Sequence, residues 1–356
     1  IDLVTAKASP ALKAKLQALK AAMEKSTATE PGPWNARRLS DFRAALAKDG
    51  LDGFILPRGD EHQGEYVSPR AERLAWLTGF TGSAGLAIVL RERAAIFVDG
   101  RYTLQVQTQV DTRLFEPRHL TEDPPQDWLA RQAKGLKIGF DPWLHTDDGL
   151  AKLRAGADKA GASLVAVARN PVDAAWSDQP PPPLAPVRPH AVRFAGRGSA
   201  DKRAEIAAKL AADGYDAAVI SAPDAVAWLL NIRGGDVPHT PLALCFAILE
   251  ANGGVDLFID QRKLLPTTAA HLGNEVRLSP PDGFGAALDR LGRDKARVLL
   301  DAATGAVWIG ERLERAGASV VRGQDPCALP KACKNAIELA NTRAAHSRDG
   351  AALTRF

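Results

Sequence analysis

The chain has 356 residues, of which 46% are hydrophobic and 25% are charged, as is usual for a globular protein. The net charge of +4 is spread along the chain without a basic cluster interleaved with aromatics, which argues against a nucleic-acid partner. No apolar stretch approaches the roughly 18 residues of a membrane helix, so no membrane span is expected. Three cysteines, Cys245, Cys327 and Cys333, are an odd and low number that fits a reducing, cytoplasmic compartment. At about 150 residues per domain, the length predicts two domains and a fragment of a third.

The N-terminal part of the chain precedes the first domain. Residues 1–25 carry five lysines among alanines and leucines, and they lack the continuous apolar centre of a signal peptide. We expect a surface helix there, followed by a linker or loop at 26–36. Together, residues 1–36 are interpreted as an N-terminal helix and loop.

The first domain is assigned to residues 37–176. Apolar residues at helical spacing predict a helix from Arg37 to Lys48, which Asp49 and Gly50 end. Strands are then predicted at 53–57, 86–90, 94–99, 136–140 and 163–168, and helices at 102–110, 126–134 and 148–160. Strands that alternate with helices are typical of an α/β layered domain.

Residues 177–195 change in character. Pro180 to Pro183 form an unbroken proline run, and Pro186 and Pro189 follow closely. Proline fixes φ and removes the backbone donor, so this stretch is predicted to be extended polyproline II. A ligand for an SH3-type domain is one interpretation, and a semi-rigid connector between two domains is the favoured one.

The second domain is assigned to residues 196–325. A helix is predicted from Ser199 to Ala212, with Ser199 as its N-cap. Strands are predicted at 216–221, 242–249, 255–260, 275–278, 297–301 and 318–322, and helices at 224–230, 283–292 and 304–316. The layout is again that of an α/β domain.

The two domains resemble two copies of one unit. An Asp-Gly turn and Asp52 precede an apolar run in the first domain, and Asp216 follows Asp52 by 164 residues in the same context. A later strand ends at Asp99 in one domain and at Asp260 in the other, 161 residues further on. A near-constant offset with matched chemistry indicates a duplicated domain.

A third unit starts at residues 326–356. Asn335 and Glu338 match a capping box, in which each side chain satisfies an amide of the first helical turn. The helix predicted from Ala336 carries His346 on its polar side. It continues to Phe356 without a terminal Gly or Pro signal.

The sequence contains no recognisable metal or phosphate motif. No HExxH or paired-histidine spacing occurs, and Cys327 and Cys333 lie six residues apart, which does not match common zinc spacings. The glycine-rich stretch from Gly79 to Gly85 lies before a strand rather than before a helix. It is therefore interpreted as tight turns that allow close backbone approach.

Asp60, Glu61 and His62 form the one local cluster of acids and histidine. On an extended segment, Asp60 and His62 share a face, where they could act as an acid–base pair. The favoured interpretation is a hydrogen-bonded loop that fixes the end of a strand.

Arg101 follows the strand ending at Val98 and an Asp-Gly turn. Its planar guanidinium suits a carboxylate or a peptide carbonyl. The alternative is an internal ion pair with Asp99, Glu65 or Glu72, and the bare pattern favours that pairing.

Several ordered motifs together resemble a known family. They are the runs at 57–66 (PRGDEHQGEY), 76–85 (WLTGFTGSAG), 98–102 (VDGRY), 227–234 (AWLLNIRG) and the helix start at 334–349. The series is similar to the cytosolic type of aminopeptidase P, the Xaa-Pro aminopeptidases of the pita-bread metallopeptidase superfamily. The resemblance covers nearly all of residues 37–356.

The resemblance implies a specific architecture. It predicts two tandem creatinase-N-terminal-like α/β domains of ribonuclease-H-like fold, followed by the first helix of an incomplete pita-bread catalytic domain. Prolidases and creatinases resemble this arrangement with a single N-terminal domain. The duplication therefore favours the long aminopeptidase P form over a creatine-type amidinohydrolase.

The resemblance also implies an activity. In this family a catalytic domain binds two divalent ions, commonly manganese, and a metal-activated hydroxide releases the residue that precedes a proline. The family's metal ligands are two Asp, one His and two Glu, which would all lie beyond Phe356. We therefore expect no catalytic residue and no metal ligand in this chain, and residues 1–356 alone are predicted to be inactive.

The expected role of these residues is to shape the substrate pocket and to form a homodimer. The family resemblance gives Arg101 a contact with bound peptide whose second residue is proline, and Asp60 and His62 are weaker candidates for the same contact. The alternative is a stand-alone peptide-binding or dimerisation module without hydrolytic activity.

Overall fold

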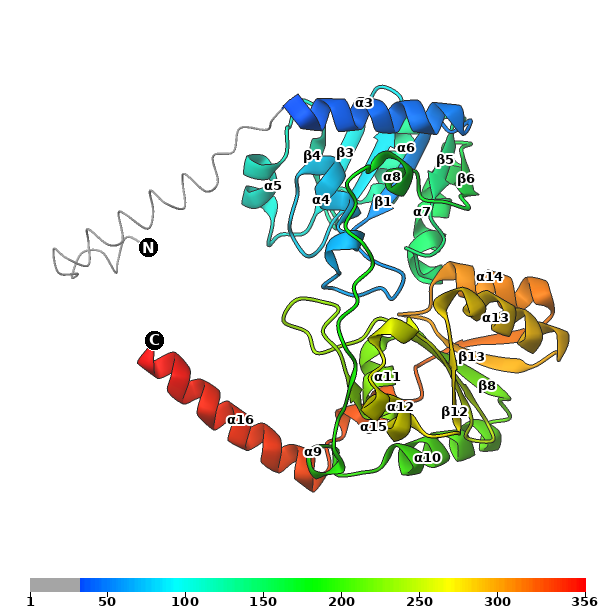
Figure 1. Ribbon diagram of the computed structural model, residues 1–356. Coiled ribbons are helices and arrows are strands. Elements are labelled where there is room, and N and C mark those ends of the chain that lie inside the picture. The colour runs from blue at the N-terminus through cyan, green and yellow to red at the C-terminus, as the bar shows by residue number, and fades with distance from the viewer. Residues whose placement is uncertain (1–32) are drawn as a thin grey trace. The chain divides into compact units, whose positions relative to one another are not determined.

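The structure is a computed structural model that describes residues 33–356 (Figure 1). The surface helix predicted within residues 1–25 lies outside the described residues. The chain divides into two compact units. The described part of unit 1 comprises 33–58, 73–141 and 153–178, and unit 2 comprises Gly59–Glu72, Pro142–Lys152 and Gln179–Phe356.

Unit 1 is built on a six-stranded sheet with the order β4-β3-β2-β1-β5-β6. Its strands are β1 (Gly53–Pro57), β2 (Leu86–Leu90), β3 (Ala94–Val98), β4 (Glu116–His119), β5 (Lys137–Phe140) and β6 (Ser163–Ala166). Its helices are α3 (Pro33–Lys48), α4 (Arg73–Thr78), α5 (Thr103–Gln109), α6 (Pro125–Gln132) and α8 (Pro171–Ala175), and α7 (Asp147–Lys159) spans the division between the units.

Both faces of this sheet carry apolar side chains that helices cover. Phe42 of α3 is fully buried and meets Phe54 of β1 edge-to-face, with ring centroids 5.9 Å apart. Phe97 of β3 meets Trp128 of α6 in the same geometry at 6.2 Å. Burying each such side chain stabilises the fold by about 1.5–3 kcal/mol. The result is the predicted α/β layering.

Unit 2 contains a second six-stranded sheet, with the order β12-β11-β10-β8-β13-β14, and a separate two-stranded sheet of β7 and β9. The strands are β7 (Arg188–Pro189), β8 (Ala217–Ile220), β9 (Ile232–Arg233), β10 (Phe246–Glu250), β11 (Val255–Phe258), β12 (Val276–Ser279), β13 (Arg297–Asp301) and β14 (Ser319–Gly323). The helices are α9 (Val192–Ala195), α10 (Ser199–Ala212), α11 (Pro223–Leu229), α12 (Pro266–Leu272), α13 (Phe284–Arg293), α14 (Val307–Ala316), α15 (Ala328–Ala332) and α16 (Ala336–Arg355). Three short 3-10 helices are η1 (Pro69–Ala71), η2 (Gln261–Lys263) and η3 (Pro281–Gly283).

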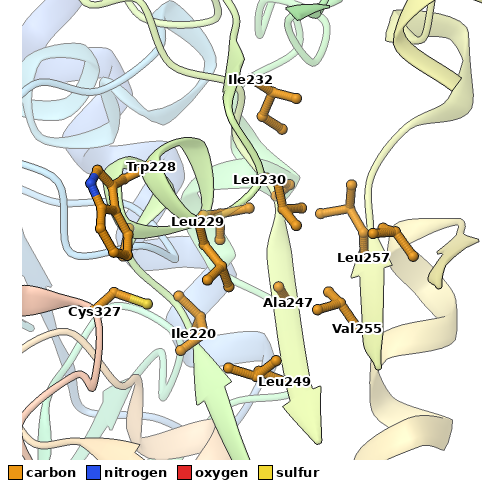
Figure 2. Packing of buried hydrophobic residues seen from close by; sticks show 14 of the residues in the cluster. Ile220, Trp228, Leu229, Leu230, Ile232, Ala247, Leu249, Val255, Leu257 and Cys327 are labelled. Atoms are coloured by element: carbon orange, nitrogen blue, oxygen red, sulfur yellow. The ribbon is translucent and has the colours of Figure 1, made fainter. Parts of the chain in front are cut away.

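One core of unit 2 lies on the face of the sheet that α10 and α11 cover. Figure 2 shows Ile220, Leu249 and Leu257 from the sheet gathered with Trp228 and Leu229 from α11. The buried thiol of Cys327 belongs to the same cluster. Cys245 is also part of it, as expected for a small buried hydrophobic residue.

The opposite face of the same sheet packs against α13 and α14. Val219 and Leu300 from the strands meet Phe284 and Leu288 of α13 in a second cluster. Neighbouring residues of β8 therefore contribute to different faces, because successive side chains along a strand alternate. Unit 2 is thus a three-layer α/β/α structure.

The two sheets have the same topology, which confirms the predicted duplication. β1 pairs antiparallel with β2 and parallel with β5, and β8 pairs antiparallel with β10 and parallel with β13. Asp52 donates its N–H to the carbonyl of Lys137 and accepts the N–H of Lys137 on its carboxylate, each at 2.8 Å. Asp216 makes the same two bonds with Arg297, at 2.9 and 2.7 Å.

Two segments that precede residue 153 pack within unit 2. The ring of Trp143 stacks on Trp308 of α14 with centroids 4.0 Å apart, and Thr146 forms an isolated β-bridge with Ala306. The N–H of Val307 donates to the carbonyl of His145 at 2.8 Å. The two compact units are therefore not consecutive stretches of the chain.

Some sequence-based expectations need correction. Helix α3 begins at Pro33, inside the predicted 26–36 loop, since proline suits the first turn of a helix. The strand predicted at 242–249 begins only at Phe246, because residues 242–245 belong to a loop. Ser199 is the first residue of α10 and Gly198 is its N-cap, without a side-chain bond. Several short elements have no counterpart among the predictions: strands β4, β7 and β9 and helices α4, α8, α9, α12 and α15.

Other local expectations are confirmed. The Asn335 carboxamide oxygen accepts the N–H of Glu338, and the Glu338 carboxylate accepts the N–H of Asn335, each at 3.0 Å, so the capping box is present. Helix α16 then continues to Arg355, and none of its residues is buried. A Cβ at Gly82 would lie 2.2 Å from the ring of Phe80, which explains a glycine at that turn. Within residues 33–356, no helix has the length and apolar character to cross a membrane.

Candidate functional site

Arg101 lies three residues after the end of β3 and pairs with Asp99. Its Nη2 atom donates to Oδ2 of Asp99 at 2.8 Å, and its backbone N–H donates to Oδ1 at 2.9 Å. This guanidinium holds the pKa of the Asp99 carboxyl below its usual range. The Arg101 side chain is 59% exposed. Asp99 was one of the three acids considered as internal partners of Arg101, and it forms that pair. The Arg101 side chain nevertheless faces solvent.

The second copy of the domain repeats this pair. Nη2 of Arg262 donates to Oδ2 of Asp260 at 2.6 Å, and the Arg262 N–H donates to Oδ1 at 3.0 Å. The bond from Arg262 lowers the pKa of Asp260 to about 2. An Asp-x-Arg pair at the strand exit is therefore a structural property of the repeat. A specific role for Arg101 would have to come from its surroundings, since the pair itself is not unique.

Asp60 and His62 lie together in unit 2, in the segment that follows β1. Oδ1 of Asp60 accepts the N–H groups of His62 and Gly64, each at 3.0 Å. The Asp60 carboxylate therefore bonds to the backbone of His62 rather than to its ring. This is the hydrogen-bonded loop of the favoured interpretation, and within residues 33–356 no hydrogen bond joins the Asp60 carboxylate to the His62 ring.

The His62 ring has two partners of its own. Nδ1 lies 3.0 Å from the carbonyl oxygen of Ser221, so Nδ1–H donates, because a carbonyl can only accept. In the neutral ring this leaves Nε2 as an acceptor. The ring also stacks on Phe246 of β10, with centroids 4.3 Å apart and planes 25° apart. Both contacts fix the ring orientation.

Asp60 and His62 line a cavity of about 200 Å³ whose lining residues all belong to unit 2. The lining comes from Asp60 and residues 62–66, from the start of α11, from the loop between β9 and β10, and from Thr304. Asp60 and His62 are buried, whereas Glu65, Tyr66 and Asp224 are exposed. The buried carboxylate and imidazole therefore lie at the inner end of the cavity.

A buried ion pair supports the wall of this cavity between β9 and β10. Nζ of Lys263 donates to Oδ2 of Asp236 at 2.6 Å. Asp236 also accepts the N–H groups of Leu244 at 2.7 Å and of Ala185 at 3.3 Å. Leu244 lines the cavity directly, so the ion pair fixes part of its shape.

Local sequence patterns identified only one side of this cavity. Asp60 and His62 stood out as a cluster, but Ser221, Val237 and Thr304 come from distant segments and have ordinary local contexts. Only the fold brings them together. Arg101 belongs to unit 1, whereas Asp60 and His62 belong to unit 2.

No metal-ligand cluster occurs in the part of the chain that the structure describes. Among residues 33–356, no group of three or more His, Cys, Asp or Glu side chains could hold an ion. Cys327 is buried and Cys333 is exposed, and neither forms a disulfide. The described residues therefore do not fit a dinuclear metal site.

Two sequence-family models match the chain. Residues 38–170 match a model described as "Creatinase/Prolidase N-terminal domain", and residues 178–338 match a second model with the same description. The two matches fall on the two copies of the repeated sheet. Together they account for most of the chain.

Similar proteins carry one recurring name. The chain is 37% identical over 333 residues to a "Probable Xaa-Pro aminopeptidase P" of Aspergillus clavatus. That alignment covers 90% of this chain and 50% of the Aspergillus protein. It is 36% identical over 350 residues to a protein of the same name from Coccidioides posadasii, and the alignment covers 93% of this chain and 52% of that protein. The chain thus spans about half the length of the curated relatives it matches.

A solved structure is similar over the same range. The X-prolyl aminopeptidase from Caenorhabditis elegans, described as a cytosolic enzyme with a di-nuclear active site, aligns with a TM-score of 0.85 and 28% identity. The alignment covers 91% of this chain and 55% of that one. Both copies of the repeated domain therefore have counterparts in a single related protein.

Proposed function

Because this chain belongs to the family of creatinase/prolidase N-terminal domain proteins, we propose that it is the non-catalytic N-terminal part of an Xaa-Pro aminopeptidase. The observation that carries the proposal is the similarity to proteins named Xaa-Pro aminopeptidase P over about nine-tenths of this chain, across both domain copies. A single N-terminal domain would account for only one of the two repeated sheets.

The proposed reaction is hydrolysis of the peptide bond between the first residue and a proline at the second position. Proline lacks the backbone N–H and fixes its φ, so ordinary peptidase sites do not accept it and a dedicated pocket is needed. Two divalent ions, manganese in our proposal, would supply the hydroxide that attacks the carbonyl. Their ligands would come from a catalytic domain that begins near residue 326 and continues after Phe356.

The proposed part of this chain in that reaction is recognition. Arg101 would bind the peptide through its exposed guanidinium, and Asp60 and His62 would contribute a second contact. In this proposal the domains comprise 37–176 and 196–325, joined by a connector at 177–195. The complete protein would act in the cytoplasm as a homodimer, and the description of the C. elegans enzyme as cytosolic supports the compartment.

Two experiments test the proposal. The coding sequence after Phe356 should encode the spaced Asp, Asp, His, Glu, Glu set, and a stop codon there would support a stand-alone module instead. Purified residues 1–356 should release no alanine from Ala-Pro-Ala with Mn²⁺, whereas the complete gene product should do so at a rate typical of enzymes. Turnover by residues 1–356 would place the catalytic centre inside this chain and overturn the assignment.

A further inference from the structure

Asp60 has a carboxylate oxygen for which residues 33–356 provide no hydrogen-bond partner. Oδ1 accepts the N–H groups of His62 and Gly64, whereas Oδ2 is buried and accepts none. The residue is 1% exposed, so bulk water does not reach it. Leaving a buried acceptor without a hydrogen bond is destabilising, and more so if the acceptor is charged. Oδ2 therefore needs a donor that the described chain does not supply.

Gly64 places no side chain next to this oxygen. A Cβ at Gly64 would lie 3.7 Å from Oδ2 of Asp60 and 3.0 Å from the carbonyl oxygen of Tyr66. Glycine keeps this position empty, between a charged acceptor and a neutral one. A primary ammonium group carries three donors and a positive charge, so it can address both oxygens at once.

The cavity next to Asp60 has room for more than an ion. Its volume of about 200 Å³ corresponds to about seven water molecules in the liquid. Much of its wall is apolar and consists of Ala222, Pro223, Val237, Leu242 and Leu244. Such a wall favours an aliphatic body over a hydrated ion, since burying apolar surface is favourable.

The charges around the cavity favour a cation. The lining includes the acids Asp60, Glu65 and Asp224 and no Lys or Arg. Asp224 is paired with Lys331, which lies outside the lining, so the Asp224 charge is already balanced. Nδ1–H of His62 donates to the carbonyl of Ser221, so the ring is held with Nδ1 turned to the backbone. The negative charge at the inner end thus comes from Asp60.

We propose that this cavity binds a primary ammonium group on an aliphatic chain, with the ammonium on Oδ2 of Asp60. Two sources share that chemistry, a lysine side chain and the N-terminus of a peptide. This inference deepens the proposed function. It rests on that function in one respect, which is that the natural ligand is a peptide. The ion contact and the apolar wall do not depend on any catalytic step.

The first test is binding of a matched pair of small probes to residues 1–356. n-Butylammonium and n-butanol share the aliphatic body and differ in the charged head group. In ¹H–¹⁵N spectra, n-butylammonium should shift the amide signals of His62 and Gly64 saturably, because both amides donate to Asp60. n-Butanol at the same concentration should shift them little. Equal shifts from the two probes would mean that the cavity selects only apolar character, which would overturn the proposal.

Two variants locate the contact. Asp60→Asn removes the charge at constant shape and should weaken n-butylammonium binding at least tenfold. Gly64→Ala leaves the charge in place but fills the space next to Oδ2, and it should also abolish the response. Asp282→Asn changes an exposed acid of η3 outside the cavity and should bind like the unmodified protein. Because the two cavity variants act differently, a folding defect in one still leaves the other as a test.

Further probes separate the sources and the competing ions. Nα-acetyl-lysinamide offers only the side-chain ammonium, and leucinamide offers only the N-terminal one, so the tighter of the two identifies the natural carrier. Potassium chloride at equal ionic strength should not reproduce the shifts. Saturable shifts with K⁺ alone, or none with any ammonium probe, would overturn the ammonium assignment. These outcomes are independent of whether the complete gene product cleaves Xaa-Pro peptides, so the two proposals can fail separately.

Discussion

The ammonium nitrogen of Lys263 lies 2.6 Å from a carboxylate oxygen of Asp236, and the two side chains are only 5% and 0% exposed. Lys263→Met should remove the positive charge and leave the buried Asp236 carboxylate without its countercharge. Breaking a buried pair in this way costs about 3–5 kcal/mol. Urea unfolding of the variant should show a loss of this size.

An exposed ion pair provides the control for Lys263→Met. Arg37 and Asp41 are paired on the surface of α3 at 3.7 Å, with side chains 85% and 62% exposed. Arg37→Ala should change the free energy of unfolding by less than about 1 kcal/mol, because water screens such pairs. Equal effects of the two substitutions would contradict the role assigned to burial.

His145 should make the protein less stable in mild acid. Burial lowers the pKa of His145 to about 4, so the folded state binds the proton more weakly than the unfolded state does. The stability is fully present above about pH 6.5 and decreases as the pH falls towards 4, by about 3 kcal/mol in total. Unfolding free energies measured across this range should show the slope.

Replacing the titrating ring tests that explanation. His145→Gln should flatten the change in unfolding free energy between pH 6.5 and pH 4. His346→Gln on the exposed surface of α16 should leave the slope as it was. If His145→Gln keeps the full slope, other groups are responsible for the acid sensitivity.

Gly82 should not tolerate a side chain. A Cβ at this position would lie 2.2 Å from the Phe80 ring, and Phe80 is fully buried and cannot turn away freely. Gly82→Ala should destabilise the protein by about 1–3 kcal/mol, as overpacking does. Gly59→Ala is the matched control, since nothing lies within 4 Å of its Cβ position. Similar melting temperatures for the two variants would rule out the steric explanation.

The repeated Asp-x-Arg pair offers an internal control for the proposed peptide contact. Arg101→Ala in the complete gene product should raise KM for Xaa-Pro peptides about tenfold or more, the size expected from a lost charge-assisted hydrogen bond. Arg262→Ala removes the equivalent pair from the second copy and should leave KM unchanged. The two variants should lose similar, small amounts of stability, because both arginines are mostly exposed. A KM effect shared by both would indicate a structural role.

The sequence predicted regular elements where local and tertiary preferences agree. The apolar run that became β3 is buried at every position, and the capping box at Asn335 needs only its own helix turn. Duplication was visible because Asp52 and Asp216 bond equivalent neighbouring strands, which keeps them at matching positions. Such features are encoded within a short stretch of chain.

The sequence could not predict features that depend on distant partners. Residues 242–245 look like a strand because they are apolar, but Asp236 and Lys263 hold them in a loop. β4 has the sequence EPRH, without a strand pattern, and it forms because β3 offers an edge. In the same way, the wall of the cavity next to Asp60 includes Thr304 and the loop between β9 and β10. No local sequence motif predicts that these segments lie together.

The packing of Trp143 on Trp308 has a consequence for dividing this protein into pieces. A fragment that ends at residue 178 would still contain 59–72 and 142–152, but it would lack the surface that these segments cover. Trp143 would then face water, and the cavity next to Asp60 would lose most of its wall. Each unit consists of three separate segments of the polypeptide, so no single cut of the chain leaves both units whole.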